Sequence, residues 1–296
     1  MSPKQVWRLI KEAFQAWSQD NASRLAAALA YYTIFSIAPL LILVIAIAGL
    51  FFDSAAVRDQ LMEQVQSLVG GSGADFVQTV LDNANRPGEN SGWLASAISI
   101  GLLLVGATGV LTQLQTSLNA VWNVETRSDL GLIGLVRKRL LSLGMILGIG
   151  FLLLVSLVIS SVIVGFSNYF HGLMPGLDSL AQLLNFVVFF GITTLLFAMI
   201  FKFMPDVRIT WGDVWFGAAT TAILFSLGKF VIGLYLGNSG FGSTYGAAGS
   251  VIVLLLWVFY SAQILFFGAE LTQVYARRYG SQIVLNRFAI RRESSS

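Results

Sequence analysis

The sequence predicts an all-α polytopic membrane protein with six transmembrane helices. Of its 296 residues, 56% are hydrophobic and only 11% are charged, whereas charged residues approach a quarter of an ordinary soluble domain. The mean hydropathy is +0.75. Apolar stretches long enough to cross a bilayer recur along nearly the whole chain, with no long soluble block between them. We therefore expect a single membrane domain over residues 1–296.

The N-terminal segment is charged and amphipathic, and it lacks the order of a cleaved signal peptide. Its apolar residues recur at helical spacing: Val6, Ile10, Phe14 and Trp17. Three basic residues lie among them: Lys4, Arg8 and Lys11. This pattern predicts an amphipathic helix, which either lies in the membrane interface or packs on the protein's own inner face.

The first span is expected at about 33–52, and it contains Pro39, a residue that membrane helices tolerate better than soluble ones. Tyr32 and Ser36 share a helix face with Pro39. That face is either a polar seam against other helices or a proline kink with a hydroxyl bonded back to the backbone. The hydrophilic connection that follows, 53–91, has apolar residues at helical spacing. It is read as an external helix that covers the bundle, or alternatively as a solvated loop.

The second span is expected at about 93–122. Its latter half carries polar side chains on one stripe: Thr108, Thr112, Gln115 and Asn119. Such residues usually bond to neighbouring helices, with a net value of about 0.6 kcal/mol each, which favours helix association over a substrate path. The third span is expected at about 140–164, where Gly144 and Gly148 form a weak GxxxG signal for close helix contact.

Three further spans and a cytoplasmic tail complete the expected topology: about 183–203, 214–236 and 251–271, then 272–296. Thr210 and Asp213 form a capping-box pattern at the start of the fifth span. Apart from Lys202 at the end of the fourth span, Lys229 is the one Lys or Arg inside an expected span. Its side chain either extends toward the headgroups or has a functional role.

The basic residues indicate which side of the membrane each connection occupies. All 18 Lys and Arg residues except Arg58, Arg86 and Lys229 flank the expected spans on one side, and the positive-inside rule places that side, with both termini, in the cytoplasm. A basic inner face attracts anionic lipid headgroups, by about 1 kcal/mol per nearby cation. The net charge of +3 therefore reflects topology. Nucleic acid is not expected as a partner, because no basic groove interleaved with aromatic residues accompanies it.

Glu270 is the one ionisable residue of the sixth span, and Gln263 shares its helix face. A charge within lipid is costly unless it faces protein or water. One interpretation is that Glu270 anchors the helix to cations at the inner end: Lys202, Arg208 or Arg24. The other is a polar cavity, lined by Glu270, Gln263, the stripe of the second span and Lys229, through which an amphipathic substrate moves. Glu270 and Lys229 differ in depth by roughly 20 Å at helical rise, so we expect no direct pair.

The residue types exclude several chemistries. The chain has no cysteine and one histidine, His171, and its acidic residues are scattered. We therefore expect no disulfide, no metal site, no cofactor and no catalytic residue, and the protein is not expected to be an enzyme. Nothing in the sequence indicates an oligomeric state.

Three separated stretches carry recognisable motifs: AAALAYYTIFSIAPLL at 26–41, FMPDVRITWGDVWFGA at 203–218 and YGAAGSVIVLLLWVFYSAQILFFGAEL at 245–271. In order and spacing they resemble the YihY/virulence factor BrkB family of bacterial inner-membrane proteins. The resemblance implies a multi-pass protein of the inner membrane with links to envelope lipid or glycolipid handling and to virulence. A ribonuclease name was once attached to the family, but the residues here do not support a nuclease.

The polar seam, the basic inner face and the external cover helix favour a transporter or flippase-like carrier of a lipid or other amphipathic envelope substrate. The alternative is a non-transporting scaffold or assembly factor, in which small-residue faces and amphipathic segments bind envelope proteins. An ion-coupled transporter with Glu270 as proton carrier is a third hypothesis. A water-accessible cavity within the membrane would favour transport, and a solid bundle would favour the scaffold.

Overall fold

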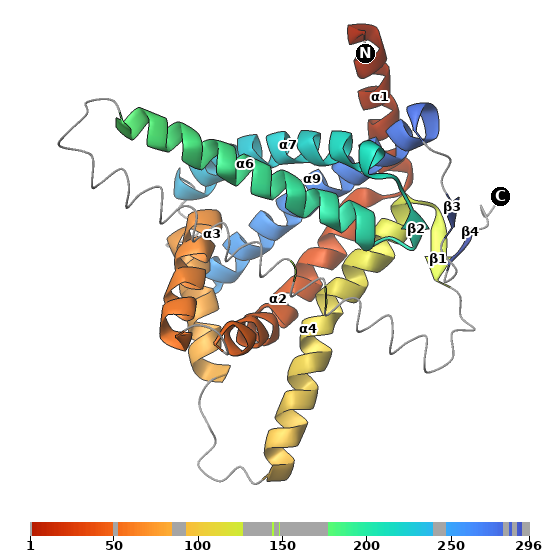
Figure 1. Cartoon of the computed structure of the whole chain (residues 1–296). Coiled ribbons are helices and arrows are strands. Elements are labelled where there is room, and N and C mark those ends of the chain that lie inside the picture. Colours follow the sequence, from red (N-terminus) through yellow and green to blue (C-terminus); the bar gives the residue numbers. More distant parts are fainter. Residues whose placement is uncertain are drawn as a thin grey trace.

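The computed structural model describes residues 2–49, 53–84, 93–126, 144, 148, 177–238, 247–280, 284–285 and 289–291. The expected third span and His171 therefore lie outside the described residues, apart from Gly144 and Gly148. Long helices dominate the rest (Figure 1): α1 Pro3–Gln19, α2 Ala22–Ala48, α3 Ser54–Ala84, α4 Trp93–Val121, α6 Leu177–Phe203, α7 Trp211–Asn238 and α9 Ala247–Tyr279.

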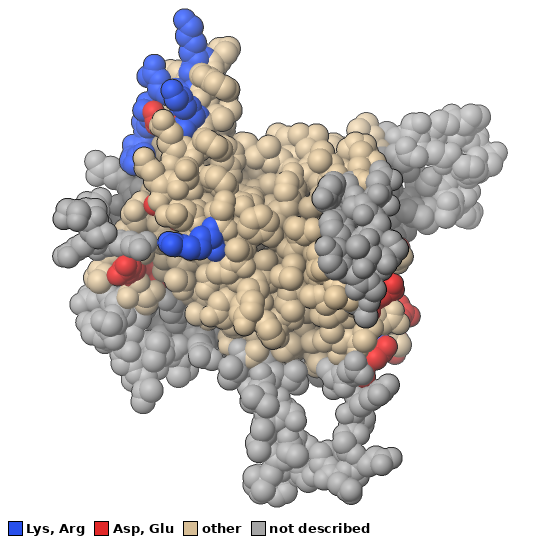
Figure 2. Space-filling view, turned by 180° about the vertical axis from the view of Figure 1, so that it is seen from behind, with Lys and Arg blue, Asp and Glu red and all other residues tan. Residues whose placement is uncertain are grey.

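Four of the described helices contain a segment long and apolar enough to cross a membrane: Ala22–Ala46 in α2, Phe186–Phe203 in α6, Trp211–Ile232 in α7 and Ala248–Tyr279 in α9. α4 occupies the position expected for the second span. Large apolar side chains remain exposed along α6 and α7, including Phe186, Leu227 and Phe230. In Figure 2 most of the described surface in the middle of the molecule is uncharged, with one group of Lys or Arg beside it. A helical membrane protein is therefore confirmed.

The first span begins earlier than expected, because the helix continues through the alanine-rich approach that starts at Ala22. Small residues from this approach, Ala22 and Ala26, are fully buried in a core shared with α4, α6, α7 and α9. Phe201 and Phe266 fill that core from α6 and α9. Alanine lets helix backbones approach closely, while the two aromatic rings supply most of the buried volume.

α3 is a helical hairpin rather than one straight helix. Gly70 has φ +77°, a left-handed conformation that glycine adopts without strain, and it separates the two arms. Val77 and Leu81 are buried against Leu41 of α2 and Leu254 of α9. The expected cover is thus confirmed as a helical element that packs across the ends of α2 and α9 (Figure 1).

α1 lies at the opposite end of the bundle from α3 and protrudes from it (Figure 1). Leu9 and Ala13 are buried against Leu271 and Val274 of α9. The predicted apolar stripe contributes little to this contact: Ile10 and Phe14 are 39% and 58% exposed, as is the adjacent Trp7 at 68%, and Trp17 packs against the central core instead. The two interpretations of this helix therefore apply to different faces of it. The face with Leu9 and Ala13 packs on the protein, and the opposite face is exposed and free to contact a membrane surface.

Two short antiparallel strand pairs form at the same end as α1, and the sequence did not predict them. β1 (Val124–Thr126) pairs with β4 (Ala289–Arg291), and β2 (Val207–Arg208) pairs with β3 (Val284–Leu285). The segment after α9 thus returns to the connections that follow α4 and α6. α7 starts just after Thr210, whose hydroxyl donates a hydrogen bond to Asp213 at 2.8 Å, so the predicted capping pair forms through its side chains.

Candidate functional site

Glu270 is the most deeply buried charged side chain among the described residues. It is 0% exposed, in the half of α9 that packs against α1, α2 and α7. Neither of its carboxylate oxygens accepts a hydrogen bond from a described donor. A buried carboxylate without donors is costly, and within a membrane span it is by default a candidate functional group.

The polar group that approaches Glu270 is another carboxyl. Asp20 follows α1 directly, where Asn21 adopts φ +52° and turns the chain sharply into α2. The Asp20 side chain is half-buried, and its charge acts on the Glu270 carboxyl. Two carboxylates offer only acceptors, so a hydrogen bond between them requires that one carries a proton.

The α7–α9 contact fixes the position of Glu270. A methyl group at Gly217 would lie 1.7 Å from Thr272 Oγ1, and one at Gly268 would lie 1.8 Å from Thr221 Oγ1. Each threonine hydroxyl donates to the carbonyl of the glycine four residues earlier on its own helix, at 2.7 Å. The two helices thus present reciprocal glycine–threonine pairs with no spare room. Because Gly268 and Thr272 flank Glu270, this contact sets the rotation of α9.

The predicted GxxxG pair does not make a comparable contact with the described residues. A methyl group at Gly144 would meet nothing within 4 Å, and one at Gly148 would meet only Met199 Cε, at 3.2 Å. The tight glycine contacts among the described helices are instead those of Gly217 and Gly268.

Gln263, predicted to extend a polar line from Glu270, contacts α2. Its side-chain amide donates to Ser23 Oγ at 3.2 Å. Further along α9, Gln273 donates to the carbonyl of Val121 at 3.0 Å, which satisfies a backbone acceptor at the end of α4. The polar residues on either side of Glu270 therefore have partners, in contrast to Glu270.

A second buried carboxyl, Asp206, has a full set of donors. Asn119 Nδ2 donates to it at 2.9 Å, Gln115 Nε2 at 3.2 Å and Thr126 Oγ1 at 2.9 Å. In return, the Asp206 backbone N–H donates to Asn119 Oδ1 at 2.8 Å. The C-terminal half of the predicted stripe is thus a clamp that joins the end of α4 to the connection after α6.

The N-terminal half of the stripe, Thr108 and Thr112, has a different role. Thr112 donates to the Thr108 carbonyl at 2.8 Å and is exposed, whereas Thr108 is buried. On α2, Ser36 Oγ lies 3.2 Å from the place a methyl group on Gly109 would occupy, and Tyr32 packs beside it. The face that carries Tyr32 and Ser36 is therefore a helix–helix contact.

The three cations expected beside Glu270 lie elsewhere. Lys202 donates to the Ile209 carbonyl and lies over the Trp211 ring, 5.8 Å from its centre. Arg24 and Arg208 are exposed. Of the described charged groups, those that act on Glu270 are Asp20 and the exposed Arg277. None of the three cations expected from the sequence is thus among the charged groups that act on Glu270; those groups are the acidic Asp20 and the basic Arg277.

Lys229 also lies apart from Glu270. Gly228 packs against Tyr260, so Lys229 is about ten residues of α9, or roughly 15 Å, away from Glu270. Its Nζ lies 5.4 Å from the centre of the Phe189 ring and borders a shallow hollow of about 390 Å³. That hollow does not include Glu270.

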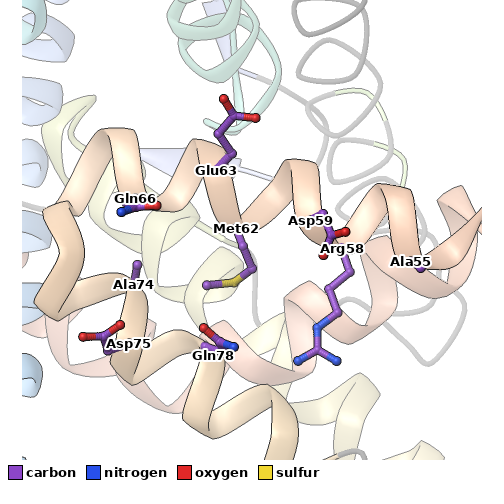
Figure 3. Close-up of a pocket in the computed structure, with 9 residues that line it drawn as sticks. All are labelled: Ala55, Arg58, Asp59, Met62, Glu63, Gln66, Ala74, Asp75 and Gln78. Carbon is purple, nitrogen blue, oxygen red and sulfur yellow. The ribbon is translucent and has the colours of Figure 1, made fainter.

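A larger hollow, of about 490 Å³, lies between the two arms of α3. Figure 3 shows Met62 and Arg58 pointing into the gap, while Glu63 points away from it. Arg58 also forms an ion pair with Asp82 of the second arm. No group of three or more His, Asp or Glu side chains suited to a metal ion occurs in the parts of the chain that the structure describes.

Asp20 is the residue of this site that sequence reasoning missed. Asp20 precedes the expected first span, and it is an isolated acid in a segment whose neighbouring charges are mostly basic. That contrast was the available signal. Asp206 was noted only within a motif, and its pairing with Asn119 could not be read from either residue alone.

Comparisons with known proteins identify relatives but no activity. The family model described as virulence factor BrkB matches residues 13–289. A UPF0761 membrane protein of Albidiferax ferrireducens is 30% identical over 269 residues, 90% of this chain and 61% of the relative. One of Alteromonas mediterranea is 30% identical over 260 residues, 86% and 83% of the two chains. The chain thus spans under two thirds of the first relative's length. No solved structure matches it.

Proposed function

The chain belongs to the virulence factor BrkB family of bacterial membrane proteins, and from this membership and the buried Glu270 we propose that it is a carrier. Its substrate is a lipid or another amphipathic molecule of the envelope. The observation that carries the proposal is a carboxyl, 0% exposed in a membrane-spanning helix, that has no hydrogen-bond donor among its described neighbours. A fold gains no stability from such a group, which favours a functional reason for its presence.

The surface charge supports an orientation in the inner membrane. Figure 2 shows most of the visible Lys and Arg gathered on the protruding α1, whereas the opposite edge, where α3 lies, shows Asp and Glu; a few acidic residues also lie on and near α1. The positive-inside rule then assigns the α1 end to the cytoplasm and α3 to the outer side. In this orientation Glu270 lies toward the inner end of its span.

Anionic lipid headgroups are the proposed partners of α1. Trp7 and Phe14 expose an apolar face, and Lys4, Arg8 and Lys11 supply positive charge along the same helix. A helix of this kind binds the membrane surface through buried apolar area and attraction to anionic lipids. α1 is thereby held along the inner leaflet while its C-terminal end presents Asp20 to Glu270.

The test is lipid movement in proteoliposomes. Vesicles are prepared with fluorescently labelled phosphatidylglycerol or phosphatidylethanolamine, and the labelled lipid that crosses the bilayer is measured by chemical quenching from outside. We expect wild-type protein to move at least one lipid faster than protein-free vesicles do, and Glu270→Gln to reduce that rate. Equal rates for wild type, Glu270→Gln and protein-free vesicles would remove the carrier function.

A second candidate function, a non-transporting membrane scaffold, is favoured by the tight α7–α9 packing. The reciprocal contacts of Gly217 and Gly268 leave no space between these helices, and the two hollows described above lie away from Glu270. The scaffold predicts that Glu270→Gln changes association with other proteins but no lipid movement. Affinity purification of wild type and Glu270→Gln, alongside the vesicle assay, separates the two functions.

A further inference from the structure

The outer part of α7 carries a cation at the edge of a surface that faces lipid. Ile223, Leu227, Phe230 and Leu234 recur on α7 at spacings of four, three and four, and all four side chains are exposed. Because α7 contains an apolar segment long enough to cross a membrane, side chains exposed on it contact acyl chains. Lys229 lies beside this stripe, on the side of α7 that faces α6.

The described neighbours of Lys229 include an aromatic ring but no carboxylate partner. The Lys229 Nζ lies 5.4 Å from the centre of the Phe189 ring of α6, a range at which a cation is attracted to the ring face. Neither ion pair of the described residues involves Lys229. The ammonium group has three N–H donors, and no hydrogen bond between described residues uses them. Its donors and most of its charge therefore remain for a ligand.

The Lys229 side chain is directed toward α6 rather than toward the outer surface. Phe189 lies about 14 residues, or roughly 21 Å, before the end of α6, and Lys229 about 18 residues, or roughly 27 Å, after the start of α7. A short connection joins those two helix ends, and the helices pack against each other (Figure 1). The ring is thus nearer the inner surface than the Lys229 backbone is, so contact with it draws the ammonium into the span.

A hollow of about 390 Å³ opens beside this ammonium, and its volume is in the range of ligand pockets. The described residues that line it are Ser226, Lys229, Phe230 and Leu234. The Ser226 hydroxyl donates to the Ala222 carbonyl at 2.8 Å, so Lys229 supplies the donors that face the hollow. The described lining thus combines one positive charge with apolar surface.

We propose that this hollow binds a net-anionic phospholipid, whose phosphate pairs with the Lys229 ammonium while an acyl chain lies on the exposed stripe of α7. The apolar surface around the cation favours a lipid over free phosphate. A headgroup with one net negative charge, such as that of phosphatidylglycerol, complements the single cation. The amine of a zwitterionic headgroup would find no carboxylate in the described lining. The site deepens the proposed carrier function, on which it rests only in taking the bound lipid as substrate.

The position of the hollow specifies the leaflet that supplies the lipid. With α1 on the cytoplasmic side, Lys229 lies in the outer half of α7, roughly 15 Å from Glu270 along the span. The phosphate of an outer-leaflet lipid reaches this ammonium with a smaller displacement than that of an inner-leaflet lipid. Lys229 thus marks a lipid site at the outer leaflet, whereas α1 contacts the inner one.

Native mass spectrometry of the full chain tests the site. Detergent-purified protein is incubated with phosphatidylglycerol, phosphatidylethanolamine or phosphatidylcholine of identical acyl chains, and the lipid retained per protein is counted. We expect phosphatidylglycerol to be retained in preference to the other two lipids. Lys229→Met removes the charge but keeps a long apolar side chain, and it should lower retention by about tenfold, the effect of losing one charge-assisted hydrogen bond.

Two matched variants isolate the charge of Lys229. Lys229→Arg keeps a cation at the same place and should retain phosphatidylglycerol nearly as wild type does. Arg58→Gln removes a cation from α3, where it lines the other hollow, and should leave retention unchanged. Both variants keep α1 intact, so lipid bound to that helix is the same in every sample.

Equal retention of phosphatidylglycerol by wild type and Lys229→Met would overturn the proposal. Equal retention of the three lipids by wild type would overturn it as well, and that comparison does not depend on the folding of a variant. Displacement of the lipid by glycerol 3-phosphate, which has no acyl chain, would show a site for free phosphate instead. A lipid-free dimer that Lys229→Met abolishes would show that a second copy of the chain covers the hollow.

The vesicle assay separates failure of this site from failure of the carrier function. Lys229-dependent retention of phosphatidylglycerol, without movement of any lipid across the bilayer, would keep the site and remove the carrier. Lipid movement without Lys229-dependent retention would keep the carrier and remove the site.

Discussion

Two buried carboxyls of this protein, Asp206 and Glu270, have opposite surroundings. Asp206 is 6% exposed and accepts hydrogen bonds from Asn119, Gln115 and Thr126. Glu270 is 0% exposed and has no described donor, only the neighbouring Asp20. The two carboxyls are thus buried to nearly the same extent, but Asp206 has a full set of hydrogen-bond donors and Glu270 has none among the described residues.

This difference separates a structural carboxyl from a functional one. Asp206 stabilises the ionised form with amide and hydroxyl donors, and in doing so it joins α4 to the connection after α6. The described residues offer Glu270 no such donor, so its burial is costly. Burial does not distinguish the two residues, but the hydrogen-bond donors around their oxygens do.

The largest expected effect on stability is that of Asp206→Asn. The substitution replaces one carboxylate oxygen with NH₂, which then faces either the Gln115 donor or the donors of Asn119 and Thr126. At least one buried hydrogen bond is therefore lost and a donor is left unsatisfied. We expect unfolding to become easier by about 3 kcal/mol. Denaturant unfolding in detergent, followed by circular dichroism, measures it. An unchanged midpoint would show that the Asp206 clamp is not needed.

Gly268→Ala tests whether the close contact between α7 and α9 contributes to stability. The new methyl group would meet Thr221 Oγ1 at 1.8 Å, so α7 and α9 must move apart, at a cost of about 2 kcal/mol. The control is Gly191→Ala on α6, where nothing lies within 4 Å; we expect it to be neutral or slightly stabilising. Equal midpoints for the two variants in the same unfolding assay would contradict the tight contact.

Glu270→Gln is expected to have a small effect on stability, in contrast to Asp206→Asn. Replacing a buried carboxyl that has no donors with a neutral amide of the same shape removes a desolvated charge, so we expect stability to stay within about 1 kcal/mol of wild type or to rise. If Glu270→Gln lowered the free energy of unfolding as much as Asp206→Asn does in the same assay, Glu270 would be a structural residue like Asp206.

The smallest effect is expected for Glu12→Gln. Glu12 and Arg278 form an ion pair between α1 and α9 whose side chains are 25% and 36% exposed. Pairs in such partly solvated positions contribute at most about 1 kcal/mol, and less at high salt. Unfolding midpoints at low and high salt check this. A large, salt-independent loss would show that this pair, rather than the apolar contact of Leu9 and Ala13, holds α1 to the bundle.

The helices could be predicted from the sequence because their signals are local. An apolar run has the length of a span wherever it folds, so the positions of α6, α7 and α9 agree with expectation to within a turn or two. The contacts between elements were mostly not predictable. Asp20 and Glu270, or Asn119 and Asp206, meet only once the neighbouring helices are known, and the strand pairs depend on where the segment after α9 returns. The pattern of α1 identified its exposed face, whereas Leu9 and Ala13 form the face that packs.

The central claim is most directly tested by measuring lipid movement per folded molecule for two amide variants, Glu270→Gln and Asp206→Asn, in the same vesicles. The account predicts that Glu270→Gln folds like wild type but moves lipid at least tenfold more slowly, while Asp206→Asn yields less folded protein that still moves lipid at close to the wild-type rate per molecule. Wild-type movement by folded Glu270→Gln would contradict the account.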